Sequence, residues 1–262
     1  MRLNYNFILL LACLIAIFFL FLFSKLISAV FAVVFLIFWI LATASPKIHI
    51  FGAVINHGSR KSKKVALTFD DGPYGSASEK ILDILKEKNA KATFFVLGNN
   101  AGKYPRILKR MTAEGHLVGN HSLDHSSLLF LKSRKNYLKN MTASEENIFS
   151  VLGKRPRFFR PPWGLKYPEM MAALESKGYL VILWDIITLD PFSWAGKKII
   201  LRKIMNNLRP GSIIALHDGR DTKIDYPRNN IIEALPEIID GIRAKGFEIA
   251  PLDQLIGEKA YF

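Results

Sequence analysis

The sequence has little cysteine and few acidic residues. Cys13 is the only cysteine among 262 residues, which excludes an intrachain disulfide framework but leaves the cellular compartment open. The 22 Asp and Glu residues stand against 36 Lys and Arg, for a formal net charge of +14. No motif of a nucleic-acid-binding module accompanies this charge, so an anionic lipid surface or an anionic polymer is the expected partner, not nucleic acid. Internal repeats are also absent, and no oligomeric state is predicted.

The first 45 residues form an apolar segment that predicts insertion into a membrane. From Phe7 to Ala44 nearly every residue is apolar, with a polar break at Ser24 and Lys25. This run is longer than the roughly 7 to 15 apolar residues of a signal peptide. One straight helix would reach about 57 Å, against a hydrocarbon core of about 30 Å. Two transmembrane helices, 7–23 and 26–44, are therefore predicted.

The sequence leaves the side of the membrane open. A two-helix hairpin returns the chain to its starting side, and the basic flanks, Arg2 before it and Lys47 to Lys64 after it, then favour a cytoplasmic domain. A single true span would instead place the domain outside. The N-terminal helices are therefore predicted to anchor the protein in the membrane, and the catalytic domain could lie on either side of it.

A basic linker, 46–64, precedes a single domain predicted over 65–257, in which strand-like and helix-like segments alternate. This alternation indicates a parallel α/β architecture. The stretch 179–187 is the most continuously apolar part of the domain and is predicted as one interior strand. Ser76 followed by Glu79 predicts a capping box that opens a helix.

The stretch 68–73, TFDDGP, places two carboxylates where an apolar run stops. Carboxylates at the end of a buried strand can face a site, which would make Asp70 and Asp71 chemically active. Asp and Gly also favour turns for backbone reasons. Taken alone, the stretch supports both interpretations equally.

His121 and His125 lie four residues apart in HSLDH. On one helical turn this spacing would bring two imidazoles to the same side, although such pairs also occur by chance on solvated surfaces. With Asp71, two histidines and one carboxylate would leave a coordination position open for water, as in a hydrolytic zinc site.

Two further residues gain meaning only from their context. His217 ends the apolar run ALH, where a satisfied core histidine is the simpler interpretation. Arg160 follows two phenylalanines, so it either reaches solvent or pairs with a carboxylate such as Asp70, because an unpaired buried guanidinium is costly.

These pieces, in this order, resemble the polysaccharide deacetylase family, which is carbohydrate esterase family 4 and is known for its NodB homology domain. The resemblance covers 65 to about 255 and leaves out the membrane segment. The motifs that carry it are TFDDG at 68–72, HSLDH at 121–125, RPPWG at 160–164, a tryptophan-aspartate segment at 184–190, and LHD at 216–218.

The resemblance implies a distorted (β/α) barrel and metal-dependent hydrolysis of N-acetyl groups on amino sugars. It implies a divalent metal, commonly zinc with cobalt or a similar ion as an alternative, held by Asp71, His121 and His125. It also implies that Asp70 is the general base.

The resemblance assigns four supporting roles. Arg160 would hold Asp70, and His217 would be the general acid that protonates the departing amine. Asp190 would orient His217. A backbone N–H near Trp163, where the family often has Tyr, would stabilise the oxyanion together with the metal.

The fourth motif departs from the family pattern, which has two Asp residues three apart followed by Trp. Ile187, Asp190 and Pro191 occupy the corresponding positions here. The substrate-facing wall is therefore uncertain, although Phe192 or Trp194 could fill the same space. The departure concerns specificity more than chemistry.

Three functions follow from the sequence. The leading hypothesis is an N-deacetylase of a polysaccharide such as peptidoglycan, a chitin-like polymer or an exopolysaccharide. The first alternative is a deacetylase or deformylase of a lipid-linked amino sugar at the membrane. The second is a catalytically silent, membrane-tethered glycan-binding protein, since fold does not fix function.

Overall fold

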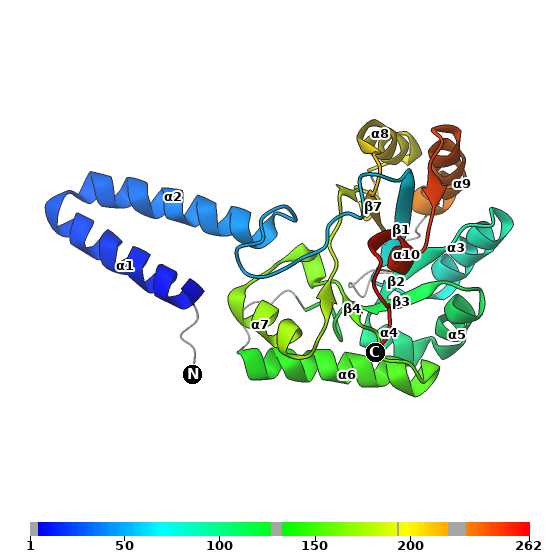
Figure 1. Cartoon of the computed structure of the whole chain (residues 1–262), viewed down its shortest axis with the longest axis horizontal. Coiled ribbons are helices and arrows are strands. Elements are labelled where there is room, and N and C mark those ends of the chain that lie inside the picture. The colour runs from blue at the N-terminus through cyan, green and yellow to red at the C-terminus, as the bar shows by residue number, and fades with distance from the viewer. Residues whose placement is uncertain (1–4, 127–132, 193, 220–228) are drawn as a thin grey trace.

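The computed structural model describes residues 5–126, 133–192, 194–219 and 229–262 (Figure 1). Two apolar helices, α1 (Tyr5–Phe23) and α2 (Lys25–Ala44), precede an α/β domain and extend away from it. They meet at Ser24, whose side chain caps α2 by accepting a hydrogen bond from the Ile27 N–H. The Ser28 hydroxyl donates to the Ile17 carbonyl oxygen at 3.1 Å and so joins the two helices.

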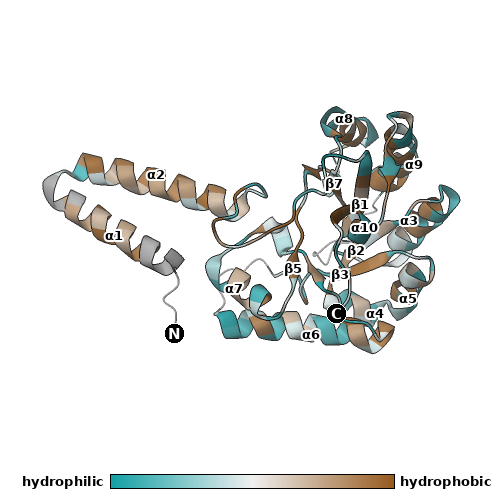
Figure 2. Cartoon of the chain, in the orientation of Figure 1, coloured by the Kyte–Doolittle hydropathy of each residue, from teal (hydrophilic) through white to brown (hydrophobic). Residues whose placement is uncertain are grey.

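Only α2 meets the length and composition needed to cross a membrane, among the residues that the structure describes. Figure 2 shows that α2 is apolar along most of its length. The described apolar part of α1, Leu10–Phe19, is shorter. One candidate span is thus established by composition, and the second predicted span is not.

The domain is organised around a parallel sheet with the strand order β5-β4-β3-β2-β1-β7-β6, and β8 pairs with β1. The parallel α/β class is confirmed, and the described strands pair as a curled half-barrel. The strands are β1 (Lys64–Asp70), β2 (Ala92–Val96), β3 (Leu117–Asn120), β4 (Phe158–Phe159), β5 (Leu180–Val181), β6 (Ile186–Ile187), β7 (Ile213–His217) and β8 (Glu248–Ile249).

The single strand predicted over 179–187 is wrong. The segment forms two short strands, β5 and β6, at opposite ends of the sheet. Between them, the carbonyl oxygens of Ile182 and Leu183 accept hydrogen bonds from the Arg160 side chain at 3.2 and 3.1 Å. The buried Arg160 guanidinium therefore donates to backbone carbonyl oxygens that, in a continuous strand, would accept hydrogen bonds from a neighbouring strand.

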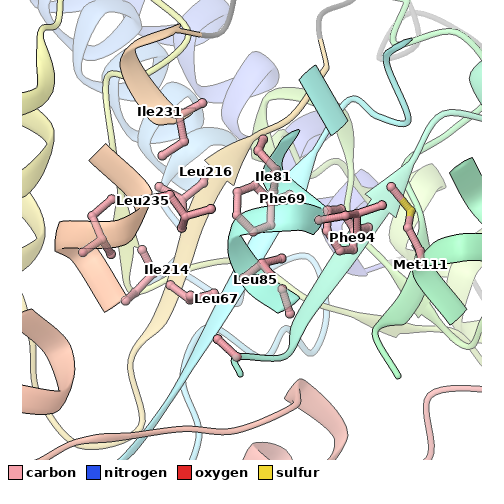
Figure 3. Close-up of a cluster of buried hydrophobic side chains, with 14 of the residues drawn as sticks. Leu67, Phe69, Ile81, Leu85, Phe94, Met111, Ile214, Leu216, Ile231 and Leu235 are labelled. Carbon is pink, nitrogen blue, oxygen red and sulfur yellow. The ribbon is translucent and has the colours of Figure 1, made fainter. Parts of the chain in front are cut away.

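Helices on the outer side of the sheet enclose the larger hydrophobic core (Figure 3). Phe69 of β1 stacks on Phe94 of β2, with ring centroids 5.1 Å apart, and helix residues such as Ile81, Met111 and Leu235 pack around them. The helices that contribute to this core are α3 (Gly75–Glu87), α4 (Gly98–Lys103), α5 (Pro105–Ala113), α6 (Arg134–Leu152), α8 (Lys197–Asn207) and α9 (Asn229–Ala244). The other described helical elements of the domain are the 3₁₀ turn Pro162–Gly164, α7 (Pro168–Ser176) and α10 (Leu252–Ile256).

The capping box predicted at Ser76 is wrong, because α3 begins at Gly75 and Tyr74 is its N-cap. The Tyr74 N–H instead donates to the Ser78 hydroxyl at 2.7 Å. This places Ser78 beneath the first turn, where it also contacts the end of β7.

The segment 46–64 packs on the domain instead of hanging free. Phe51 and Val54 are buried in a second hydrophobic cluster. Ile55 forms a parallel bridge with Ile182, beside β5, and His57 forms an antiparallel bridge with Ser212, just before β7. The segment thus contacts the sheet at two places, beside β5 and just before β7.

Candidate active site

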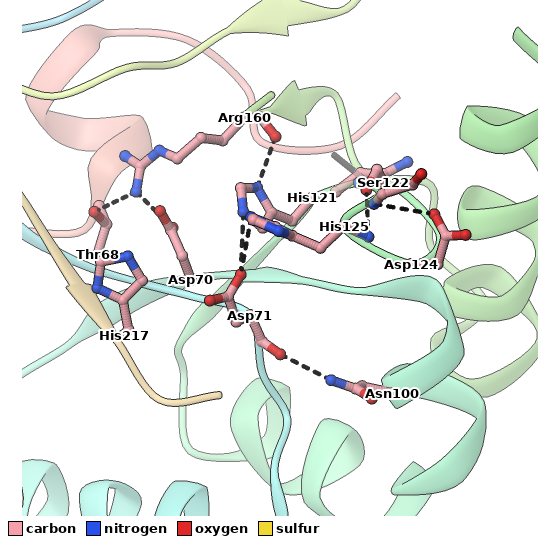
Figure 4. A network of polar contacts seen from close by, with 12 residues as sticks. Thr68, Asp70, Asp71, Asn100, His121, Ser122, Asp124, His125, Arg160 and His217 are labelled. Atoms are coloured by element: carbon pink, nitrogen blue, oxygen red, sulfur yellow. Dashed lines mark hydrogen bonds and ion pairs between the residues drawn. The ribbon is translucent and has the colours of Figure 1, made fainter. Parts of the chain in front are cut away.

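The predicted site residues converge at the carboxyl ends of the strands (Figure 4). Asp70 ends β1 and lies opposite His217, the last residue of β7, in the parallel register. His121 directly follows β3. Carboxyl ends of parallel strands meet at one edge, which is where barrel and open α/β folds place their sites.

Asp70 is buried and paired with Arg160. Its Oδ1 atom lies 2.7 Å from Nη1 of Arg160, and that same Nη1 lies 2.8 Å from the Thr68 hydroxyl oxygen. The ion-paired side chains are 0% exposed for Arg160 and 3% for Asp70. Figure 4 shows the guanidinium between Thr68 and Asp70. The sequence-based expectation that Arg160 needs a carboxylate partner is met by this contact.

Every nitrogen of the Arg160 guanidinium has an acceptor. Two of them use the backbone carbonyls of Ile182 and Leu183, and the group stacks over the Phe95 ring at 4.0 Å from its centroid. Burial lowers the pKa of Arg160 below its ordinary value, and the Asp70 carboxylate opposes that fall. Asp70 is therefore held in one orientation by a rigid, fully enclosed cation.

The Asp71 carboxylate lies between His121 and His125, while the Asp71 carbonyl oxygen accepts from the Asn100 side chain at 2.8 Å. Its buried Oδ1 atom is 3.4 Å from Nε2 of each histidine, and no described residue hydrogen-bonds it. The three ligand atoms lie within 4.8 Å of one another, and all three residues are buried. Burial raises the pKa of Asp71, but the contact with His121 and the charges of His125 and His217 bring that pKa well below its usual range.

This donor set fits a divalent cation. A buried carboxylate oxygen that faces two imidazole nitrogens is costly without a partner, and one ion between the three atoms would satisfy them all. Two histidines and one carboxylate match the ligand types of hydrolytic zinc sites, which keep one position open.

The orientation of His121 is set by the main chain of Arg160. Nδ1 of His121 lies 2.7 Å from the Arg160 carbonyl oxygen. A carbonyl only accepts, so Nδ1 carries a proton, and Nε2 is the nitrogen that faces Asp71. Arg160 thus supports both halves of the site, with its side chain on Asp70 and its carbonyl on His121.

The helical turn predicted for His121 and His125 is wrong. Residues 121–126 form a loop, with positive φ values of 77° at Ser122 and 52° at His125. Side chains from elsewhere hold the loop in place: Asn120 Oδ1 accepts from the Ser122 N–H at 2.9 Å, and the Ser144 hydroxyl donates to the same oxygen at 2.8 Å. The imidazoles still meet, but tertiary contacts bring them together instead of helical periodicity.

Left-handed backbone geometry gathers at this site. Asp71 and Trp163 have φ values of 73° and 59°, in addition to Ser122 and His125. In the described part of the chain, Asn89 is the only other non-glycine residue with positive φ. Such strain persists where surrounding contacts enforce it, and it concentrates at functional sites.

His217 and Asp190 form the opposite wall. Asp190 accepts from the His217 backbone N–H at 2.9 Å and lies 3.1 Å from its Nδ1 atom, and the Thr188 hydroxyl also donates to Asp190. Burial alone would lower the pKa of His217. The Asp190 charge and hydrogen bond, with Asp71 and Asp70 beyond, raise that pKa to about 9.

Exposed aromatic and aliphatic side chains lie within a few residues of the site residues in the chain. Trp163 is 57% exposed, and its ring lies 5.0 Å from the His125 ring in an edge-on contact. The Phe192 and Trp194 rings stack with centroids 5.7 Å apart, and both are exposed. Ile187, in the variant fourth motif, is 38% exposed.

Sequence reasoning left some supporting residues without a role. Thr68 donates to the Ile214 carbonyl oxygen at 2.8 Å while it receives Arg160. Asp218 of the LHD motif accepts from the Ser78 hydroxyl at 2.5 Å. Gly72 lies so close to Asp218 that a Cβ there would stand 2.0 Å from Oδ2. Thr68, Gly72 and Asp218 all fall inside the motifs, so their position was the available signal.

Comparison with known proteins finds a family match and similar proteins. The family model described as polysaccharide deacetylase matches residues 57–182. A peptidoglycan-N-acetylglucosamine deacetylase from Bacillus cereus is 34% identical over 200 residues, which cover 76% of this chain and 70% of the relative. A chitooligosaccharide deacetylase from Bradyrhizobium is 33% identical over 202 residues, which cover 74% of this chain and 91% of the relative.

Solved structures show the same fold. The Bc1960 peptidoglycan N-acetylglucosamine deacetylase has a TM-score of 0.73 and 30% identity, over 85% of this chain and 97% of that chain. BA3943 from Bacillus anthracis, described as a carbohydrate esterase family 4 pseudoenzyme, has a TM-score of 0.69 and 25% identity, over 78% of this chain and 68% of that chain. With relatives above 30% identity that align along most of their own length, this chain belongs to the polysaccharide deacetylase family.

Proposed function

We propose that the protein is a hydrolase of carbon–nitrogen bonds other than peptide bonds, which removes N-acetyl groups from the amino sugars of a glycan with the help of a divalent metal. The observation that carries the proposal is the buried Oδ1 atom of Asp71, which faces two imidazole nitrogens at 3.4 Å and has no hydrogen-bond partner among the residues that the structure describes. Family membership supports the same chemistry.

Asp71, His121 and His125 would hold the metal, with zinc as the first choice and cobalt or a similar ion as an alternative. Such an ion, when bound, lowers the pKa of a coordinated water and polarises an amide carbonyl. Asp70, immediately before Asp71 in the chain, would take the proton from the attacking water. Its Oδ1 atom is engaged by Arg160, so Oδ2 is the atom proposed to receive the proton.

His217 would supply the proton that the departing amine needs. Its Nδ1 atom is held by Asp190, so Nε2 is the atom proposed to donate. A pKa of about 9 keeps this imidazole protonated at neutral pH, as a general acid requires. A backbone N–H near Trp163 is proposed as an oxyanion donor, and the exposed Trp163, Phe192 and Trp194 rings as contacts for the sugar.

The substrate class follows from the relatives as a proposal. Their names specify peptidoglycan and chitooligosaccharides, both of which carry N-acetylglucosamine. We assign to this chain an N-acetylated glycan of that kind. The α2 helix is proposed to anchor the protein in a membrane.

A silent glycan-binding protein is the competing function, and BA3943, which is described as a pseudoenzyme, shows that the fold occurs in a catalytically silent protein. The described site argues against it. A protein that only binds glycan would need neither a buried cluster of Asp71, His121 and His125 nor a histidine paired with a carboxylate. Both the cluster and the pair of His217 with Asp190 are present here.

Acetate release tests the proposal. The metal-loaded full chain is incubated with the soluble tetramer of N-acetylglucosamine, and acetate is measured with time. Release by the wild type that is lost in Asp70→Asn but kept in Glu87→Gln, an exposed carboxylate on α3, supports deacetylation. No release from this tetramer or from peptidoglycan fragments would favour the silent function.

A further inference from the structure

The C-terminal end of α2 is built into the α/β domain by Lys166. The Lys166 ammonium donates to the carbonyl oxygens of Ser45 at 2.6 Å and Thr43 at 3.3 Å, and the Lys166 backbone N–H donates to the Thr43 carbonyl oxygen at 2.9 Å. Lys166 is 0% exposed. A buried cation at the negative end of a helix dipole makes a specific attachment. We call these three contacts the Lys166 clamp.

Apolar packing reinforces the clamp. Ala42, in the last turn of α2, is 0% exposed within the second hydrophobic cluster, and Trp39 packs against the same cluster. The Trp39 ring lies 5.2 Å from the Phe51 ring. The cluster also contains Phe159 and Trp184, which flank the third and fourth motifs. The helix end and the site therefore share one core.

The chain after α2 does not act as a flexible tether. The Asn56 side chain donates to the Pro46 carbonyl oxygen at 3.0 Å. The preceding residue, Ile55, forms the parallel bridge with Ile182. Phe51 and Val54 are buried between these points. The domain is thus fixed to the helix end at several places.

This arrangement fits an anchor that stays attached. Cleavage after α2 would remove the Thr43 carbonyl and the Trp39 ring from the domain. Lys166 would then keep only the Ser45 carbonyl as an acceptor, and the second hydrophobic cluster would lose Ala42 and Trp39. A removable leader has no reason to supply core contacts.

The clamp also sets the distance of the site from the bilayer. With α2 as the proposed anchor, its 20 residues span about 30 Å, which equals the hydrocarbon core, and this would place the helix end at the headgroup boundary. Trp163 precedes Lys166 by three residues and is therefore no more than about 11 Å from it along the backbone. The Trp163 ring contacts His125 at 5.0 Å. The site therefore lies close to the headgroup layer.

We propose that the Lys166 clamp holds the site at the membrane surface so that it acts on an N-acetylated amino sugar carried as a lipid headgroup. This substrate class rests on the N-deacetylase function proposed above. A glycan strand far from the bilayer would not reach the site, whereas a lipid-linked sugar is delivered to it by diffusion in the membrane. Exposed Lys47, two residues after Ser45, and the net charge of +14 suit an anionic headgroup.

Two substrates separate this proposal from the general function. The metal-loaded full chain in lipid vesicles receives N-acetylglucosamine linked through diphosphate to a polyprenyl lipid, or the soluble N-acetylglucosamine tetramer. We expect a kcat/KM at least about tenfold higher for the lipid-linked sugar, because both partners are confined to one surface. Lys166→Met removes the two ammonium contacts of the clamp, so it should reduce this advantage and retain the rate on the soluble tetramer. Lys86→Met, an exposed lysine on α3, should change neither rate.

A depth measurement tests the clamp without catalysis. Glu169→Cys, an exposed position three residues after Lys166, is combined with Cys13→Ser and carries a fluorophore. Vesicle lipids with a nitroxide on the headgroup should quench it strongly. Quenching should fall when Lys166→Met is added, because the two ammonium contacts that hold the domain to the helix end are then lost.

The outcomes are distinct. Equal kcat/KM for both substrates, or an equal loss on both in Lys166→Met, would overturn the lipid-linked assignment and leave the deacetylase function intact. Absence of quenching in the parent would overturn the fixed position of the domain. Acetate release from neither substrate would sink the deacetylase function and this substrate class together.

Discussion

Asp70 and Asp71 are neighbours in the chain, yet their surroundings differ in kind. Asp70 is complete: Arg160 holds it at 2.7 Å, and every guanidinium nitrogen is occupied. Asp71 is incomplete: its buried Oδ1 atom faces two imidazoles at 3.4 Å and has no hydrogen-bond donor among the described residues. The Asp70 carboxylate is thus paired within the protein, whereas the Asp71 carboxylate is the one that we propose binds a cation.

The contrast shows how the fold assigns two functions to one dipeptide. The positive φ of 73° at Asp71 turns its side chain away from the direction that β1 gives to Asp70. One side chain then remains beside β4, where Arg160 follows, and the other reaches the loop after β3. Backbone geometry, more than residue type, separates the proposed base from the proposed metal ligand.

The largest effect is expected from Asp71→Asn. The substitution removes the only carboxylate of the proposed ligand set, so metal binding and acetate release should both fall to background. Metal content after dialysis and acetate release are the measurements. Without metal, the variant should unfold at the same temperature as the wild type or higher, because a buried charge has been removed. A full complement of metal in this variant would contradict the assignment.

Asp70→Asn should separate catalysis from metal binding. A general base typically contributes 10²- to 10⁴-fold, so turnover should fall by about that factor while metal content stays at the wild-type level. The same dialysis and acetate assays apply, with Glu87→Gln as the matched control. Loss of metal here as well would show that the two carboxylates share one role.

Arg160→Met should remove the ion-pair partner of Asp70. It leaves the Asp70 carboxylate buried without a partner, which costs roughly 3–5 kcal/mol of unfolding free energy. Urea unfolding of the chain without metal measures the loss. Adding Asp70→Asn should recover part of it, because the orphaned charge is then gone. An additive double variant would mean that the ion pair is not what stabilises this region.

The smallest effect is expected from Asp190→Asn, and it should appear in the pH profile. The Asp190 charge raises the pKa of His217 toward 9, and the acid works only while protonated. Removing the charge favours neutral imidazole, so the alkaline limb of kcat/KM should move down by about 1 to 3 pH units. Activity near pH 6 should change least. An unmoved limb would assign the acid role to another group.

Local sequence patterns predicted the strand ends well. An apolar run that stops at carboxylates or histidines marks the edge of a parallel sheet, and this holds for β1, β3 and β7. The partner of Arg160 was also predictable, since an arginine after two buried phenylalanines needs a carboxylate. These inferences depend on burial alone, which nearby residues report.

Features that depend on distant contacts were not predictable. The loop at 121–126 needs Asn120 and Ser144 to hold its positive φ values, and Ser144 comes from α6. The break in 179–187 depends on Arg160, and the position of α2 depends on Lys166. Each involves a side chain from another element, which periodicity does not reveal.

Asp70 and His217 lie opposite each other on the paired strands β1 and β7, and this pairing sets the distance between their backbones. Neighbouring strands lie about 4.8 Å apart, so the backbone ladder itself fixes the separation of the proposed base and acid. Changes in the segment after β6, such as around Phe192, leave this separation untouched. Evolution or an engineer can therefore exchange the sugar-facing loops for a new substrate without re-optimising proton transfer.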